Sequence, residues 1–289
     1  MEIPSSLVTA AWLKQHIDQP DLVVLDASWF MPGSERNAKE EWQQQAIPRA
    51  RFFDFDTEIK DHASLLPHML PSAELFAEQV TQLGITNQSK IVVYDSQGIF
   101  SAPRVWWMFR AMGHQHVAVL DGGLPAWVQA GGQLSQGEMP ISATVDYRAN
   151  FQPHWLVDAD TVNRQLNNYA VTIVDARPKA RFNGEQPEPR EGVRSGHMPN
   201  AQNLPFAKLV VDGHLAKSEK LAQYFEALSL DKTDIDVQLQ EQQYIFTCGS
   251  GITACILALA AEQTGRTNLA VYDGSWTEWG AETRYPVEC

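Results

Sequence analysis

The sequence of 289 residues is poor in cysteine. It has three, Cys248, Cys255 and Cys289, and all of them lie in the last fifth of the chain. An odd count confined to one end excludes the disulfide framework typical of small secreted domains. Each thiol is therefore a candidate either for a small buried apolar side chain or for a nucleophile.

Positive charge and long apolar segments are also scarce. Lys and Arg number 22 against 35 Asp and Glu, which gives a net charge of −13 and argues against nucleic acids or anionic membranes as partners. The longest apolar run, 254–261, is too short to span a bilayer. The first 16 residues show no secretory signal pattern, and we expect a soluble cytoplasmic protein.

The sequence does contain a repeat with a spacing near 150 residues, which indicates a duplicated domain. Three apolar runs of the first half have counterparts in the second half. They pair Leu22–Asp26 with Val171–Asp175, Ile91–Tyr94 with Tyr244–Thr247, and Val119–Gly123 with Val271–Ser275.

Helical patterns alternate with these runs in both halves. Phe76, Val80 and Leu83 are spaced as on one helical face, and so are Leu221, Phe225 and Leu228. Uninterrupted apolar strands alternating with helices predict an α/β fold: two tandem domains, each a mostly parallel sheet with helices on both faces. We expect an N-terminal domain over 1–138, a linker over 139–154 and a C-terminal domain over 155–289.

Cys248 stands where a strand runs into a glycine-containing loop before an apolar helix. Gly249 and Gly251 allow backbone N–H groups to converge on one anion, and the helix dipole adds to this effect. Both features would favour a thiolate or a persulfide. The alternative, a small buried side chain, is equally compatible with the position.

The first half has Asp95 where the second has Cys248, so a nucleophile would exist in one copy only.

The two remaining cysteines give weaker signals. We expect Cys255 to be a structural residue of the apolar helix. Cys289 should be mobile and chemically incidental.

Two families use such a cysteine loop. Tyrosine phosphatases need an Arg six positions after the cysteine, but Ala254 stands there. The chain instead resembles the tandem-domain rhodanese family, and more closely its 3-mercaptopyruvate sulfurtransferase branch. The segments that carry the resemblance are Cys248–Ala254, Phe53–Asp56, Pro67–Pro71, Ser101–Trp107 and Tyr272–Trp276.

The resemblance implies an activity without a metal or organic cofactor. A small 2-oxo acid thiol, 3-mercaptopyruvate, would give sulfur to Cys248 and leave as pyruvate. A thiol, a thioredoxin-like protein or cyanide would then accept the outer sulfur. Gly249 and Ser250 are uncharged, which favours this donor over thiosulfate. Rhodaneses that prefer thiosulfate tend to carry basic residues just after the cysteine.

Substrate binding is assigned by the same resemblance. Arg181 and Arg190 would hold the substrate carboxylate, while Gly249, Gly251, Ile252 and Thr253 form the loop around the sulfur. Without the resemblance, surface arginines paired with nearby glutamates (Glu185, Glu188 and Glu191) would be the simpler interpretation.

A proton relay is also implied. Ser250, His68 and Asp56 would assist proton transfer at the substrate, which places the site between the domains. Asp54 is an alternative to Asp56, and from the sequence alone a structural histidine in a Pro-flanked loop is the preferred interpretation of His68. Two other functions stay open: a thiosulfate sulfurtransferase, and a persulfide carrier or interaction module that turns over no small donor.

Overall fold

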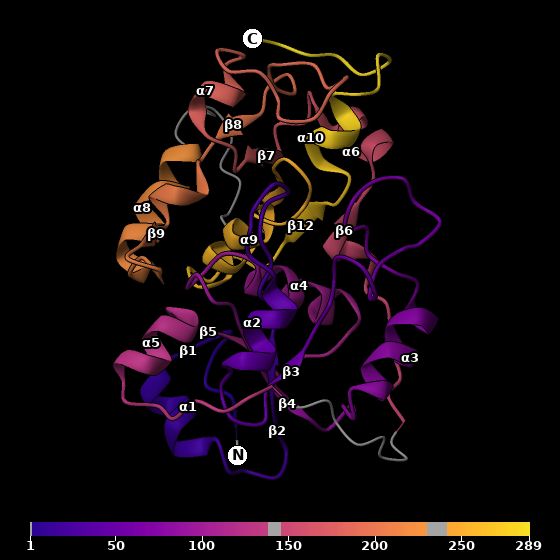
Figure 1. Cartoon of the computed structure of the whole chain (residues 1–289). Helices are drawn as coiled ribbons and strands as arrows, with labels where there is room; N and C mark the ends of the chain where they lie inside the picture. The colour runs from indigo at the N-terminus through magenta and orange to yellow at the C-terminus, as the bar shows by residue number, and fades with distance from the viewer. Residues whose placement is uncertain (1, 138–145, 230–241) are drawn as a thin grey trace. The chain divides into compact units, whose positions relative to one another are not determined.

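Two five-stranded sheets with matching strand order lie in the two halves of the chain (Figure 1). The computed structural model describes residues 2–137, 146–229 and 242–289. The strand orders are β1-β5-β4-β2-β3 and β6-β12-β11-β7-β8, and the strands of each sheet are parallel. The prediction of two α/β domains with parallel sheets is confirmed.

Contacts divide the chain into two compact units. The first comprises residues up to 63, 70–152 and 212–215, and the second comprises 64–69, 153–211 and 216–289. Two short segments therefore group with the other half of the sequence. Residues 139–145 of the predicted linker lie outside the described residues, so the boundaries at 138 and 155 stay a prediction.

The first ten helices and strands of the chain belong to the first unit. They are β1 (Leu7–Val8), α1 (Ala10–His16), β2 (Leu22–Asp26), α2 (Ala38–Gln44), β3 (Arg51–Phe52), α3 (Ala73–Gln82), β4 (Lys90–Tyr94), α4 (Ala102–Ala111), β5 (Val117–Leu120) and α5 (Gly123–Gln129). Buried Leu13, Trp42 and Trp127 of α1, α2 and α5 pack together in one core. Phe76 of α3 meets Phe109 of α4 edge to face in another, at 5.1 Å between ring centroids.

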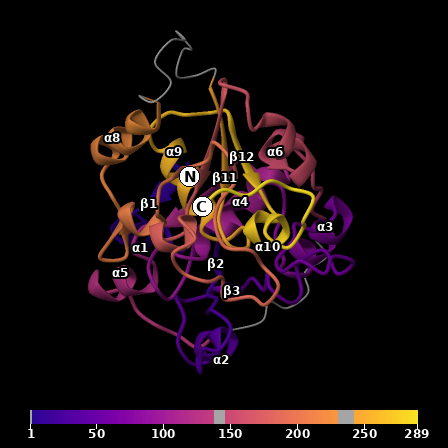
Figure 2. The same cartoon turned by 90° about the horizontal axis from the view of Figure 1, so that it is seen from above.

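The second unit repeats this plan. Its elements are β6 (Leu156–Val157), α6 (Ala159–Gln165), β7 (Val171–Asp175), α7 (Lys179–Phe182), β8 (Gln202–Asn203), α8 (Ser218–Ser229), β11 (Gln243–Thr247), α9 (Ala254–Glu262), β12 (Leu269–Tyr272) and α10 (Ser275–Trp279). Figure 2 shows α8 and α9 side by side and α6 close to α10. Short 3-10 helices (Pro153–Trp155 and Phe206–Lys208) and a small sheet of β9 (Val210–Val211) and β10 (His214–Leu215) complete the elements.

The longest apolar run of the sequence is explained by α9. This helix contacts β11 and β12 on one side and α8 on another, and its residues from Ala254 to Ala261 are fully buried. A helix that is apolar all round is expected only where every face is covered. None of the helices in the described ranges has the length and apolar character that a bilayer crossing requires.

A buried carboxyl group ends β2. Asp26 is 2% exposed, and its Oδ1 accepts the backbone N–H of Ser28 at 2.8 Å. Burial raises the pKa of Asp26 to about 6, because the charged form loses its hydration, and this outweighs the hydrogen bonds from Ser28 and Tyr94. The folded protein therefore binds this proton more tightly than the unfolded chain does.

We predict that Asp26→Asn stabilises the protein at neutral pH. A raised acid pKa means that stability decreases as the pH rises from about 4 through 6, and two pKa units correspond to at most about 3 kcal/mol. The gain should be full at pH 7.5 and vanish near pH 4, as measured by urea unfolding.

The matched control for this prediction is Asp21→Asn, just before the same strand. Asp21 lies 2.7 Å from Lys90, which lowers its pKa, so its loss should be neutral or slightly destabilising at pH 7.5. If Asp26→Asn were less stable than the wild type at both pH values, the buried charge would be worth more than its desolvation costs.

Candidate functional site

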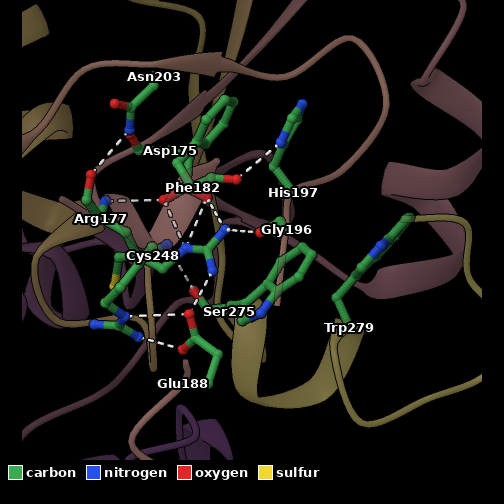
Figure 3. Close-up of polar contacts among 12 residues, drawn as sticks. Asp175, Arg177, Phe182, Glu188, Gly196, His197, Asn203, Cys248, Ser275 and Trp279 are labelled. Carbon is green, nitrogen blue, oxygen red and sulfur yellow. Dashed lines mark hydrogen bonds and ion pairs between the residues drawn. The ribbon is translucent and has the colours of Figure 1, made fainter. Parts of the chain in front are cut away.

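Cys248 lies at the carboxyl end of β11, one residue beyond the strand. It is 2% exposed, and its backbone N–H donates to the Ser275 hydroxyl at 3.2 Å (Figure 3). Its carbonyl accepts the N–H of Trp276 at 3.0 Å. Both backbone groups of the cysteine are thus fixed by the start of α10.

The loop that follows is fixed from the same side. The Gly249 carbonyl accepts the Thr277 N–H at 2.9 Å and the Thr277 hydroxyl at 2.6 Å. Gly251 has a φ of +81°, a left-handed conformation in which a side chain would be strained, and α9 begins three residues later. Ser250 and Thr253 are half-buried, whereas Gly251 and Ile252 are buried.

The first unit shows what a loop of this shape binds. Asp95 takes the place of Cys248 after β4, and its Oδ2 accepts three backbone N–H groups, from Phe100, Ser101 and Ala102, each at 2.9 Å. Oδ1 accepts a fourth, from Gln97, at 2.9 Å. Burial raises the pKa of Asp95, and these four donors oppose that rise. The strand-to-helix loop therefore converges on an acidic group, the property that a thiolate or persulfide needs.

Arg181 lies beside the cysteine loop. A Cβ placed on Gly249 would come within 3.4 Å of Arg181 Nη2, so the guanidinium lies against this glycine. Its Nε donates to Glu188 Oε1 at 3.1 Å, and its Nη2 donates to Oε2 of the same carboxylate. Three of the five N–H donors of Arg181 remain for a ligand.

Arg190 reaches the same part of the loop through a threonine. Its Nη1 donates to the Thr277 hydroxyl at 3.0 Å, and that hydroxyl donates to the Gly249 carbonyl. The structure thus brings Arg181 and Arg190 together around Gly249. The alternative of glutamate pairing holds for Arg181 in part, since Glu188 binds it, but that pair is buried rather than on the surface.

The sequence analysis missed the residue that orders this cluster, Arg177. Its side chain is 1% exposed and donates to both oxygens of Asp175, to Glu188 Oε1 at 2.8 Å and to the Gly196 carbonyl at 2.8 Å (Figure 3). The guanidinium also lies over the Trp276 ring, 4.1 Å from its centroid. The duplication offered a signal, because an alignment of the two copies places Arg177 opposite Ser28 and so marks a position at which the copies differ.

The predicted relay residues belong to different units. His68 is 2% exposed and belongs to the second unit, with a φ of +60°. Asp56 is half-buried in the first unit, where its Oδ2 accepts the Trp29 indole N–H at 3.1 Å. Asp54 stabilises the turn that it begins, because its carboxylate accepts the N–H and the hydroxyl of Thr57 at 2.8 and 2.5 Å.

The remaining cysteines have structural surroundings. Cys255 is fully buried in α9 and its thiol donates to the Gly251 carbonyl at 3.2 Å, in agreement with a packing role. Cys289 is exposed, but the chain end is not loose as expected. His197 and Glu288 exchange two backbone hydrogen bonds, at 2.7 and 2.9 Å, and the Cys289 thiol lies 3.7 Å from the Ser195 carbonyl oxygen.

No group of three or more His, Cys, Asp or Glu side chains in the described part of the chain could hold a metal ion. The groups gathered around Cys248 are guanidinium, hydroxyl and backbone N–H groups. Such donors suit a small oxyanion beside a nucleophilic sulfur.

We predict that Arg177→Met is strongly destabilising. It would leave Asp175 and Glu188, which are 1% and 4% exposed at their side chains, without a shared cation. Breaking a buried ion pair from one side costs about 3–5 kcal/mol. Urea unfolding followed by tryptophan fluorescence measures this, since Trp276 lies under the guanidinium.

The control variant is Arg148→Met. Its pair with Asp146 is 86% and 73% exposed, so the loss should cost less than about 1 kcal/mol. Equal costs for the two variants would contradict the assignment of Arg177 as the organising cation.

Comparison with known proteins identifies the family. The chain matches the family described as Rhodanese-like domain over residues 9–130 and 158–282. It is 40% identical to 3-mercaptopyruvate sulfurtransferase of Escherichia coli (strain K12), with 97% of each chain covered. It is 39% identical to the Homo sapiens enzyme of that name (96% of this chain, 93% of the relative) and 40% identical to Bos taurus thiosulfate sulfurtransferase (95% and 91%).

Solved structures agree with these matches. The crystal structure of SseA from Escherichia coli, described as a 3-mercaptopyruvate sulfotransferase with the rhodanese fold, superposes with a TM-score of 0.81 at 37% identity, covering 94% of this chain and 99% of that one. The sulfur transferase subunit of yeast mitochondrial complex I gives a TM-score of 0.86 at 33% identity, with 98% and 99% covered. The chain belongs to the rhodanese family and carries two rhodanese-like domains in tandem.

Proposed function

We propose that the protein is a 3-mercaptopyruvate sulfurtransferase in which Cys248 carries the transferred sulfur. The observation that carries the proposal is the placement of Arg181 against Gly249, next to the cysteine, with Arg190 attached to the same residue through Thr277. A pure persulfide carrier would not need two guanidinium groups beside its thiol. Relatives named for this activity match nearly the whole chain.

The first half-reaction forms the persulfide. The Cys248 thiolate attacks the sulfur of 3-mercaptopyruvate, an S–S bond forms and the C–S bond breaks. The electron pair of that bond passes to the carbon skeleton as the enolate of pyruvate, which then takes a proton at carbon. The loop N–H groups stabilise the sulfur anion, as their counterparts hold the carboxyl group of Asp95.

Arg181 orients the substrate through its unused donors. Glu188 occupies Nε and part of Nη2, which leaves Nη1 and the remaining Nη2 hydrogen for the substrate carboxylate. Since Nη2 is the atom nearest Gly249, this carboxylate would be held with its thiol-bearing carbon toward Cys248. Arg190 contributes its remaining donors from the Thr277 side.

Proton transfer is assigned to Ser250, His68 and Asp56. His68 is the group suited to exchanging protons near neutral pH, and Ser250 lies in the half-buried part of the cysteine loop. Asp56 is preferred to Asp54, because the carboxylate of Asp54 is already used within its own turn.

The second half-reaction returns the cysteine. A nucleophilic acceptor attacks the outer sulfur, the S–S bond breaks and its electrons return to Cys248 as the thiolate. We propose a thiol or a thioredoxin-like protein as the cellular acceptor, with cyanide as an assay substitute. The cycle needs a reduced thiol, which together with three free cysteines favours the cytoplasm.

Local charge favours this donor over thiosulfate. Arg177, Arg181 and Arg190 are opposed by Asp175 and Glu188, which leaves one net positive charge at the cluster. One positive charge matches the single carboxylate of 3-mercaptopyruvate better than the dianion thiosulfate. The bovine relative bears the name of the thiosulfate enzyme, so both donors belong in the test.

We predict that Cys248→Ser abolishes pyruvate release from 3-mercaptopyruvate. In the wild type, mass spectrometry after mixing with the donor alone should show a gain of about 32 Da, one sulfur atom, on the Cys248 peptide. Cys289→Ser is the matched control and should keep both readouts, because Cys289 lies beside Ser195, Gly184 and Gly196, away from the cysteine loop. Pyruvate release without the mass gain would contradict the persulfide route, and neither signal in the wild type would favour the carrier.

We predict that Glu188→Gln moves donor preference toward thiosulfate. The substitution adds one net positive charge and releases Arg181 from its fixed orientation. The ratio of kcat/KM for thiosulfate to that for 3-mercaptopyruvate should rise by about tenfold, equivalent to about 1.4 kcal/mol.

Glu185→Gln is the control for this charge change, because Glu185 is exposed and accepts a hydrogen bond from Asn183, which lies outside the cluster. An unchanged ratio in Glu188→Gln would mean that cluster charge does not select the donor. A clear thiosulfate preference in the wild type would overturn the choice of substrate.

A further inference from the structure

The two copies differ at the second residue after the strand that ends in a buried aspartate, β2 in the first copy and β7 in the second. β2 is followed by Ala27 and Ser28, whereas β7 is followed by Ala176 and Arg177. Asp26 and Asp175 end the two strands in the same register against β4 and β11. The first copy therefore keeps the carboxyl group but not the guanidinium that binds it in the second.

The second copy defines the space that a guanidinium needs. Around Arg177 lie the Asp175 carboxylate, the Gly196 carbonyl and the face of Trp276. Gly196 comes two residues before Met198-Pro199. Trp276 comes three residues after Asp273 and donates its N–H to the Cys248 carbonyl.

The duplication places the same three positions in the first copy. Asp26 matches Asp175, and Gln45 matches Gly196 because it comes two residues before Ile47-Pro48. Leu124 matches Trp276, because it comes three residues after Asp121 and donates its N–H to the Asp95 carbonyl at 3.0 Å. All three matched residues line one cavity of about 230 Å³. The place of the missing guanidinium is thus a hollow in the first unit.

The charges around this hollow favour a cation. Arg36 and Glu41 also line it, but they form a two-pronged pair at 2.7 and 2.6 Å and neutralise each other. Asp26 then supplies one net negative charge whenever it is ionised. Its donors, the N–H and hydroxyl of Ser28 and the hydroxyl of Tyr94, are neutral and leave about one of its four lone-pair positions for a ligand.

We propose that this cavity is a binding site for a small guanidinium-bearing cation, held by Asp26 in the place that Arg177 fills in the second unit. A planar guanidinium suits the carboxylate edge and is weakly hydrated, so it tolerates the apolar walls that Trp42, Ala38 and Leu124 provide. The site belongs to the first unit alone and does not rest on the proposed sulfur transfer.

The test uses methylguanidinium as the probe, at pH 8 and constant ionic strength, with tetramethylammonium as the charge-matched reference. Wild-type protein should show a saturable rise in Tm with methylguanidinium only. At ten times Kd the linkage relation gives about 1.4 kcal/mol, which corresponds to a shift of about 2–4 °C. Isothermal titration calorimetry should give one site per chain.

Three variants decide the assignment. Ser28→Arg supplies the guanidinium covalently, so it should remove the response to the probe. Asp26→Asn should remove it by deleting the charge, and it keeps the test valid if Ser28→Arg does not fold. Ser28→Ala should keep a saturable response, because it retains the Asp26 carboxylate and the Gln45 and Leu124 walls of the cavity. A wild-type response no larger than that to tetramethylammonium, or one that survives in Asp26→Asn, would overturn the proposal.

Discussion

The site depends on one buried guanidinium. Arg177 binds Asp175 at the end of β7 and Glu188 in the following loop, and Glu188 in turn fixes Arg181 against Gly249. Its ring partner, Trp276, holds the Cys248 carbonyl. The arginine thus joins the sheet, the substrate-binding loop and the cysteine loop, because a buried cation of this kind must satisfy several acceptors at once.

The two copies carry side chains of different chemistry at two matched positions. After the central strands, one copy places a carboxyl group in a ring of N–H groups (Asp95), and the other places a thiol at the same point (Cys248). After the neighbouring strands, one copy carries Arg177 and the other Ser28 with a cavity. The backbone is shared in both cases, so function has diverged through single side chains on an unchanged frame.

Strands that are buried on both faces are predicted well from the sequence, because a short uninterrupted apolar run is typical of such a strand. β2 and β7 have the predicted bounds, and α9 coincides with the longest apolar run. The two-residue edge strands β1 and β6 are too short to show a period.

Parts of the site could not be predicted for a different reason. An Arg just after a strand is typical of a solvated loop, and only tertiary burial distinguishes Arg177 from that case. The pairing of Glu188 with two arginines depends on the loop between 182 and 188 folding back, which no local pattern encodes. The turn around Asp54 shows the opposite case, since its Thr57 contacts are local and follow ordinary capping chemistry.

The carboxyl group of Asp95 has a further consequence for how the protein meets dissolved ions. When ionised it is an oxyanion tethered by its own backbone, so its effective concentration in the first loop does not change with buffer composition. Sulfate, phosphate or sulfite would have to displace this internal ligand to enter that loop. The side chain of Asp95 therefore protects the first loop from such ions, whatever the composition of the buffer.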